Sequence, residues 1–177
     1  MEAQEVKFIP LVMKTIVVHT VTYFFMGLIA STLLDYGSWY AESYLRGFMR
    51  QIDDPLVMAG PLFQPIRGFL FAVVFYLLRD IFFGRKNGWL IMWVMLVFVG
   101  ILSTFGPSPG SVEGMIYTIV PFSDHIKAWP EVMIQALLFS LLLTYWVEHS
   151  EKRWLNWLLG AIFVIVLILP VMGLLFS

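Results

Sequence analysis

Four polar residues, from three separate segments of a mainly apolar sequence, could meet in one cluster. They are Gln64, Arg67, Glu113 and Gln135. Gln64 and Arg67 share the stretch FQPIRG (63–68), about two turns into a long apolar segment. A charged residue at membrane depth marks a functional site by default, and a desolvated carboxylate needs a partner. The sequence therefore predicts a polar cluster around an Arg67–Glu113 pair, which either clamps the fold or binds a ligand.

The composition of the chain places this cluster in a membrane. Of the 177 residues, 60% are hydrophobic and only 13% are charged. A soluble domain of this size has too little interior to bury that much apolar surface. Because a lone strand cannot satisfy its backbone in lipid, each span must be a helix. We therefore expect an all-α integral membrane protein with one domain, residues 1–177.

The charge and the cysteine count exclude several classes of function. The formal net charge is −1, and no run of Lys and Arg is long enough to form a nucleic-acid surface or a polybasic lipid anchor. The chain has no cysteine, which excludes disulfides, thiolate metal sites and cysteine nucleophiles. We therefore expect no nucleic-acid partner and no cofactor.

Five stretches are long enough to cross a bilayer, which takes about 20 mainly apolar residues. They are residues 11–34, 61–83, 88–106, 130–147 and 154–176. The short polar turns GRKNG (84–88) and EHSEKR (148–153) connect neighbouring spans. The sequence therefore predicts a bundle of five transmembrane helices.

The distribution of Lys and Arg predicts how the bundle is oriented. The two short turns are rich in basic residues: Arg85, Lys86, Lys152 and Arg153. The long connections, 35–60 and 107–129, are mainly acidic. Cytoplasmic loops carry an excess of Lys and Arg. We therefore expect the N-terminus in the cytoplasm and the C-terminus outside it, in the inner or plasma membrane of the cell.

The first long connection contains an amphipathic pattern. Residues 37–51, GSWYAESYLRGFMRQ, repeat aromatic and apolar side chains at helical spacing. Glu42, Arg46 and Arg50 fall together on the other face. Such a pattern predicts a helix that lies flat at the outer interface of the membrane.

The second long connection is unusually apolar for a loop. In residues 106–122 the rigid turn GPSPG precedes a series of apolar residues that includes Met115 and Tyr117. Irregular backbone at membrane depth is tolerated only when protein buries it or a wet cavity receives it. We therefore expect a re-entrant or interfacial loop that brings Glu113 toward Arg67.

Five further residues are secondary candidates for a site. They are His19, Tyr23, Tyr117, Asp124 and His125. His19 lies within the first span, where an imidazole could ligate haem or a pigment. No two histidines have the spacing of a zinc site, so we expect no bound metal.

These residues leave three classes of function open. The favoured one is a non-enzymatic accessory or scaffold subunit, or a small carrier with an extracytoplasmic polar cavity for a lipid or small amphiphile. Its partners would be membrane lipid, a second copy or a larger membrane complex. The second class is an intramembrane enzyme that uses Glu113 as acid or base and Arg67 to orient an anionic group. The third class is a haem- or pigment-binding subunit that uses His19.

Overall fold

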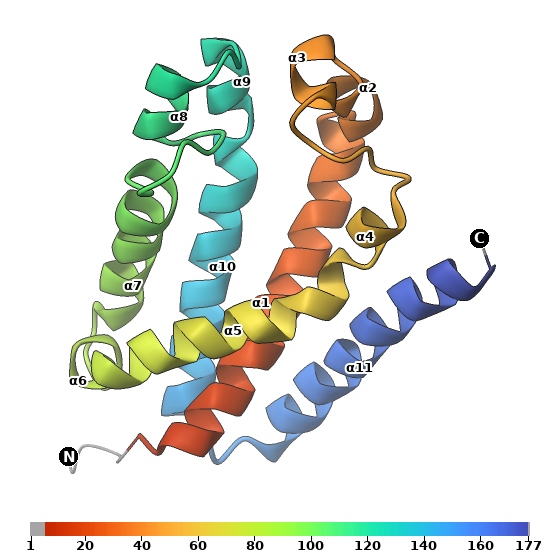
Figure 1. Ribbon diagram of the computed structural model, residues 1–177. Coiled ribbons are helices and arrows are strands. Elements are labelled where there is room, and N and C mark those ends of the chain that lie inside the picture. The colour runs from red at the N-terminus through yellow and green to blue at the C-terminus, as the bar shows by residue number, and fades with distance from the viewer. Residues whose placement is uncertain (1–5, 177) are drawn as a thin grey trace.

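The computed structural model describes residues 6–176, and the regular elements in that part of the chain are helices (Figure 1). The long helices are α1 (Phe8–Leu33), α5 (Gly60–Leu77), α10 (Trp129–Glu148) and α11 (Arg153–Phe176). Helix α7 (Gly88–Val97) continues as the π-helix η1 (Phe98–Leu102). The short helices are α2 (Tyr36–Tyr40), α3 (Ser43–Arg46), α4 (Pro55–Met58), α6 (Arg79–Phe82), α8 (Val112–Tyr117) and α9 (Phe122–Lys127).

Four helical segments are long and apolar enough to cross a membrane. They are Phe8–Leu33, Gly60–Leu77, Phe122–Glu148 and Arg153–Leu175. The remaining predicted span, 88–106, is a shorter apolar helix, with ten residues in α7 and five in η1. At about 1.5 Å per residue it is roughly 22 Å long, against about 30 Å of hydrocarbon. The structure thus establishes an all-helical chain with four candidate spans.

Two groups of short segments mark the two ends of the bundle in Figure 1. Helices α2, α3, α8 and α9 lie at one end, which we call the cap end. The turns 83–87 and 149–152 lie at the other end, together with the first residues of α1. We call this second end the turn end. Segments that are far apart in the sequence therefore meet at each end.

Helices α1 and α5 run in opposite directions and pack closely. Near the turn end the ring of Phe8 meets that of Tyr76, with 5.0 Å between centroids. Midway along the helices, a Cβ added at Gly68 would lie 2.8 Å from the Cα of Ile16. The missing side chain at Gly68 lets the two backbones approach, as small residues do at interfaces between membrane helices.

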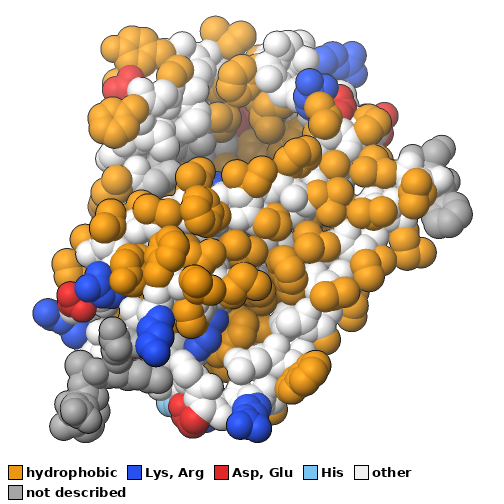
Figure 2. All heavy atoms as spheres, turned by 60° about the horizontal axis from the view of Figure 1, so that its bottom comes forward, with side chains coloured by type: hydrophobic (Ala, Val, Ile, Leu, Met, Phe, Trp, Pro, Cys, Tyr) orange, Lys and Arg blue, Asp and Glu red, His pale blue; other side chains and the backbone are white. Residues whose placement is uncertain are grey.

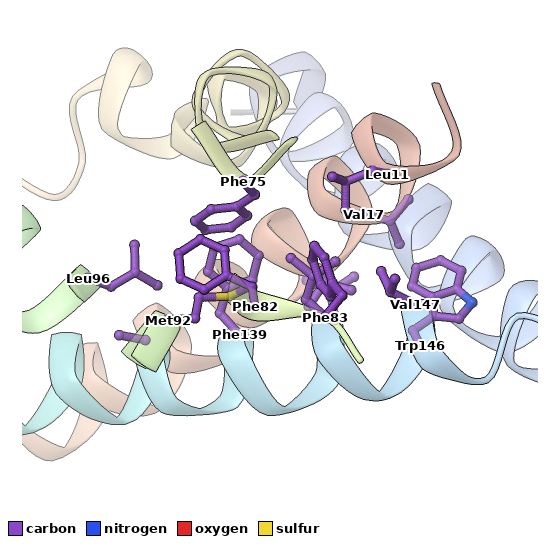
Figure 3. Packing of buried hydrophobic residues seen from close by; sticks show 14 of the residues in the cluster. Leu11, Val17, Phe75, Phe82, Phe83, Met92, Leu96, Phe139, Trp146 and Val147 are labelled. Atoms are coloured by element: carbon purple, nitrogen blue, oxygen red, sulfur yellow. The ribbon is translucent and has the colours of Figure 1, made fainter. Parts of the chain in front are cut away.

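Aromatic rings from three helices form the centre of the core (Figure 3). Phe75 of α5, Phe82 of α6 and Phe139 of α10 are all buried. The ring centroid of Phe75 lies 5.5 Å from that of Phe82 and 5.7 Å from that of Phe139. Met92 of α7 is buried beside them in the same cluster. Van der Waals packing of this kind holds membrane helices together, because lipid is as apolar as the side chains.

The predicted amphipathic helix over 37–51 is instead two short helices, α2 and α3, separated at Ala41 and Glu42. Helix α2 begins after Asp35, which has a positive φ of 46° and whose carboxylate accepts a hydrogen bond from the backbone of Ser38. The break lets aromatic side chains of both helices reach partners on α9 and α10, which one straight helix lying flat would not do. This segment is therefore tied to the bundle.

Candidate functional site

A histidine–glutamine pair is buried between α1 and α5. His19 is only 2% exposed, and its Nε2 lies 3.1 Å from Oε1 of Gln64. Since an amide oxygen can only accept, Nε2 carries the proton in this hydrogen bond. The rings of Phe71 and Phe139 lie 5.0 and 5.3 Å from the imidazole centroid. Nδ1 has no hydrogen-bond partner within the described residues.

Arg67 lies on the same helix as Gln64, on its exposed side. Its guanidinium lies 5.6 Å from the centroid of the Phe71 ring. The ion pairs within 4.0 Å in residues 6–176 are Arg50–Asp54 and Arg79–Asp80, so no carboxylate of this part neutralises Arg67. The guanidinium is a full positive charge within a candidate span, close enough to His19 to act on it electrostatically.

Glu131, in the first turn of α10, is a polar residue that the sequence analysis missed. Its carboxylate is half-buried and accepts a hydrogen bond from the hydroxyl of Tyr36. Glu131 and Arg67 both act electrostatically on the hydroxyl of Tyr23. The signal was available, because Glu131 directly follows Pro130, where the span was expected to begin.

These side chains form what we call the central polar site, with residues from α1, α5 and α10. Its members are His19, Tyr23, Gln64, Arg67 and Glu131. Gln135, predicted as a member, lies one turn beyond Glu131 and is half-buried. Its side chain makes no hydrogen bond within residues 6–176. The site therefore combines one guanidinium, one carboxyl group and three neutral polar groups.

The predicted ion pair between Arg67 and Glu113 is not formed. Glu113 lies in the first turn of α8, which is anchored locally at the cap end. Oγ of Ser111 caps this helix by accepting a hydrogen bond of 2.9 Å from the backbone N–H of Gly114. A Cβ added at Gly114 would lie 2.0 Å from the carbonyl oxygen of Ser108, so the loop closes tightly on itself. Local capping therefore keeps Glu113 away from α5.

Tyr117 does not join the central polar site either. It is the last residue of α8, and 70% of its surface is exposed.

His125 has a structural environment within the cap. It is fully buried, and its Nδ1 accepts a hydrogen bond of 2.8 Å from the backbone N–H of Gly110. The carbonyl of Gly110 accepts a hydrogen bond of 2.9 Å from the indole of Trp129. Gly110 has a φ of +88°, a conformation that favours glycine. The GPSPG turn is therefore wrapped around these two aromatic side chains.

Asp124 connects the two halves of the cap. Its Oδ2 accepts a hydrogen bond of 2.7 Å from the indole of Trp39 and another from the hydroxyl of Tyr44. The hydrogen bond to Asp124 raises the pKa of Tyr44 to about 12. Nζ of Lys127 lies 4.4 Å from the centroid of the Trp39 ring. Asp124 thus holds α2 and α3 against α9, which is a structural role.

The surroundings of His19 do not favour the haem or pigment interpretation. Gln64 occupies Nε2, and the phenyl groups of Phe71 and Phe139 pack beside the ring. This packing leaves the imidazole no open side toward a planar cofactor. Within residues 6–176, no group of three or more His, Cys, Asp and Glu side chains could hold a metal ion.

Four helices that are long and apolar enough to cross a membrane place the chain in the class of helical membrane proteins. No protein-family model matches the chain, and neither the curated proteins nor the solved structures contain a significant match to it. A function must therefore be argued from the central polar site.

Proposed function

We propose that the chain is a non-enzymatic membrane protein that binds a lipid or small amphiphile through an anionic group at the central polar site. The observation that carries this proposal is the guanidinium of Arg67. It lies within a candidate span, and no carboxylate of the described residues is within 4.0 Å of it. A charge is costly at membrane depth, and such residues mark binding sites or ion pathways.

The surroundings of Arg67 fit an amphiphile. A carboxylate or phosphate matches the planar fork of a guanidinium and forms two parallel hydrogen bonds with it. Exposed apolar side chains on α5, including Ile66 and Leu70, border Arg67 and would contact the hydrocarbon part. His19 and Gln64 supply neutral polar groups at the inner side of the site. A charged head and an apolar tail would therefore both find matching surface.

The topology completes this proposal. Helix α7 with η1 would form a fifth, shorter crossing that ends before the cap helix α8. The N-terminus and the basic turn end would face the cytoplasm. The C-terminus and the cap end would face the outside of the inner or plasma membrane. The Lys and Arg residues at the turn end support this orientation.

The ligand proposal is tested by native mass spectrometry of the full chain purified in mild detergent. Arg67→Gln should lose an anionic lipid that the unchanged protein retains, or bind it at least about tenfold more weakly, because a hydrogen bond to a charged group is removed. Arg46→Gln is the matched control, since Arg46 is an exposed arginine of the cap end. Equal lipid retention by both variants would refute the proposal. A co-purified protein partner in place of lipid would favour a scaffold.

The orientation is tested by cysteine labelling, for which the natural absence of cysteine provides a clean background. Lys86→Cys and Ser123→Cys replace exposed residues at the turn end and the cap end, respectively. In intact cells a membrane-impermeant maleimide should label the cysteine at position 123 and spare the one at position 86. The reverse pattern would invert the proposed orientation.

A further inference from the structure

A cavity at the turn end has no role in the proposal above. It has a volume of about 250 Å³ and lies where the start of α1 meets the end of α10. Its lining combines two lysines and a serine with apolar side chains: Val6, Lys7, Pro10, Leu11, Lys14, Val147 and Ser150. This cavity is separate from the central polar site and shares no residue with it.

The polar lining is basic. Nζ of Lys14 donates hydrogen bonds of 2.8 Å to the carbonyl of Trp146 and 2.7 Å to Oγ of Ser150. An ammonium has three N–H donors, so one is left without a partner among the described residues. Lys7 is exposed, and neither lysine has a carboxylate within 4.0 Å in residues 6–176. Within residues 6–176, two ammonium groups without an ion-pair partner therefore line the same cavity, and Glu151 is the carboxylate that acts on Lys14 from a longer distance.

The cavity also has an apolar side, formed by side chains of α1 and α10. Leu11 is 1% exposed and Val147 is 8% exposed, so the apolar side of the cavity consists of side chains that are packed into the bundle. Figure 2, which turns the turn end toward the viewer, shows Lys and Arg side chains at the edge of the hydrophobic surface of the helices. A lysine at such an edge extends its ammonium toward the lipid headgroups while its stem contacts apolar surface.

We propose that this cavity binds the phosphate of an anionic phospholipid, with Lys7 and Lys14 as its cationic ligands. Ser150 positions Lys14 by accepting its hydrogen bond, while the Ser150 hydroxyl donates to the carbonyl of Val147. Leu11, Val147 and Pro10 contact the glycerol and the first methylenes of the acyl chains. No polybasic run in the sequence indicates this site, because its two lysines are seven residues apart. Lys7 lies at the surface before α1, and Lys14 lies beside the end of α10. The orientation proposed above puts the cavity at the cytoplasmic leaflet, which carries anionic lipid.

The test is a lipid titration of the full-length protein, read out as bound lipid in native mass spectrometry. Phosphatidylglycerol should bind more tightly than phosphatidylcholine. Lys7→Gln should weaken phosphatidylglycerol binding about fivefold, the share expected for one basic residue near an anionic membrane surface. Lys86→Gln is the matched control, because it removes an exposed lysine from the same end outside the cavity. This control should leave the affinity unchanged.

Three results would overturn the proposal. Equal weakening by Lys7→Gln and Lys86→Gln would mean general attraction to a charged surface. Equal binding of the two lipids would mean that the net negative charge of the headgroup does not contribute, since both lipids carry a phosphate. Competition by inorganic phosphate at the same affinity would mean a free-anion site. Because Lys7 is exposed, Lys7→Gln keeps the fold even where Lys14→Gln destabilises it. Arg67→Gln should leave phosphatidylglycerol binding at this cavity intact, which separates this proposal from the one for the central polar site.

Discussion

The close contact between α1 and α5 at Gly68 gives the sharpest prediction about stability. Gly68→Ala adds one methyl group at a point where it would lie 2.8 Å from the Cα of Ile16. Two carbon atoms are in favourable contact only at about 3.5–4.0 Å. The neighbouring atom belongs to the backbone, so no rotamer change relieves the clash. The two helices must therefore separate by roughly 1 Å, judged from that contact distance.

The expected cost follows from two opposing effects. Forcing an extra carbon into a well-packed interface costs about 1–3 kcal/mol, while replacing glycine by alanine within a helix returns up to about 1 kcal/mol. We therefore expect Gly68→Ala to lower the free energy of unfolding by about 1–2 kcal/mol. Separation of the helices also lengthens the hydrogen bond between His19 and Gln64, which is 3.1 Å long and lies one turn away. Lengthening of this hydrogen bond also lowers the free energy of unfolding.

The measurement is a denaturant titration of the purified protein in mixed micelles, followed by circular dichroism. Gly27→Ala is the matched control, because Gly27 is also within a long membrane helix and a Cβ there would meet no atom within 4 Å. The control should be neutral or slightly stabilising through its helix propensity. If Gly68→Ala is no less stable than Gly27→Ala, the α1–α5 contact is not as close as described.

Two further predictions concern hydrogen bonds. Asp124→Asn should return the pKa of Tyr44 from about 12 toward its ordinary value of 10.0, seen as tyrosinate absorbance in a pH titration. Because the folded pKa is raised, this bond stabilises the cap fully below pH 10.0 and is lost as the pH rises toward about 12; an unchanged titration would contradict the assignment. His19→Leu and Gln64→Leu should each cost about 1–3 kcal/mol, because each leaves its buried partner unsatisfied. The double variant should cost less than their sum in a double-mutant cycle, and simple additivity would show that the two side chains do not interact.

The helical membrane class and most helix positions were predictable, because hydropathy and length decide them. The span expected over 61–83 shows a feature that hydropathy and length did not predict. The helix stops at Leu77, and α6 follows a break at Leu78. The break turns Phe82 inward against Phe75. An apolar run reads the same whether its side chains face lipid or a neighbouring helix, so hydropathy could not reveal this turn.

The central polar site was predictable only in part. Arg67 and Gln64 stood out because polar residues are rare in membrane spans. Which partner each would meet depends on which helices are neighbours, and composition does not contain this information. His19 was only a secondary candidate, but it is hydrogen-bonded to Gln64 of the neighbouring helix. Glu113 was expected to enter the bundle, yet its helix is capped by Ser111. The local hydrogen bond at the start of α8 thus determines the position of Glu113, and an ion pair with the distant Arg67 does not form.

The cap contact at Asp124 also has a consequence for how the protein is made. Trp39 precedes Asp124 by 85 residues and Tyr44 precedes it by 80. The α1–α5 hairpin is therefore synthesised long before the carboxylate that secures α2 and α3 leaves the ribosome. During that interval the aromatic donors have no acceptor on α9. Closure of the cap is thus a late step of biogenesis, and it joins the first and second halves of the chain once membrane insertion has reached α9.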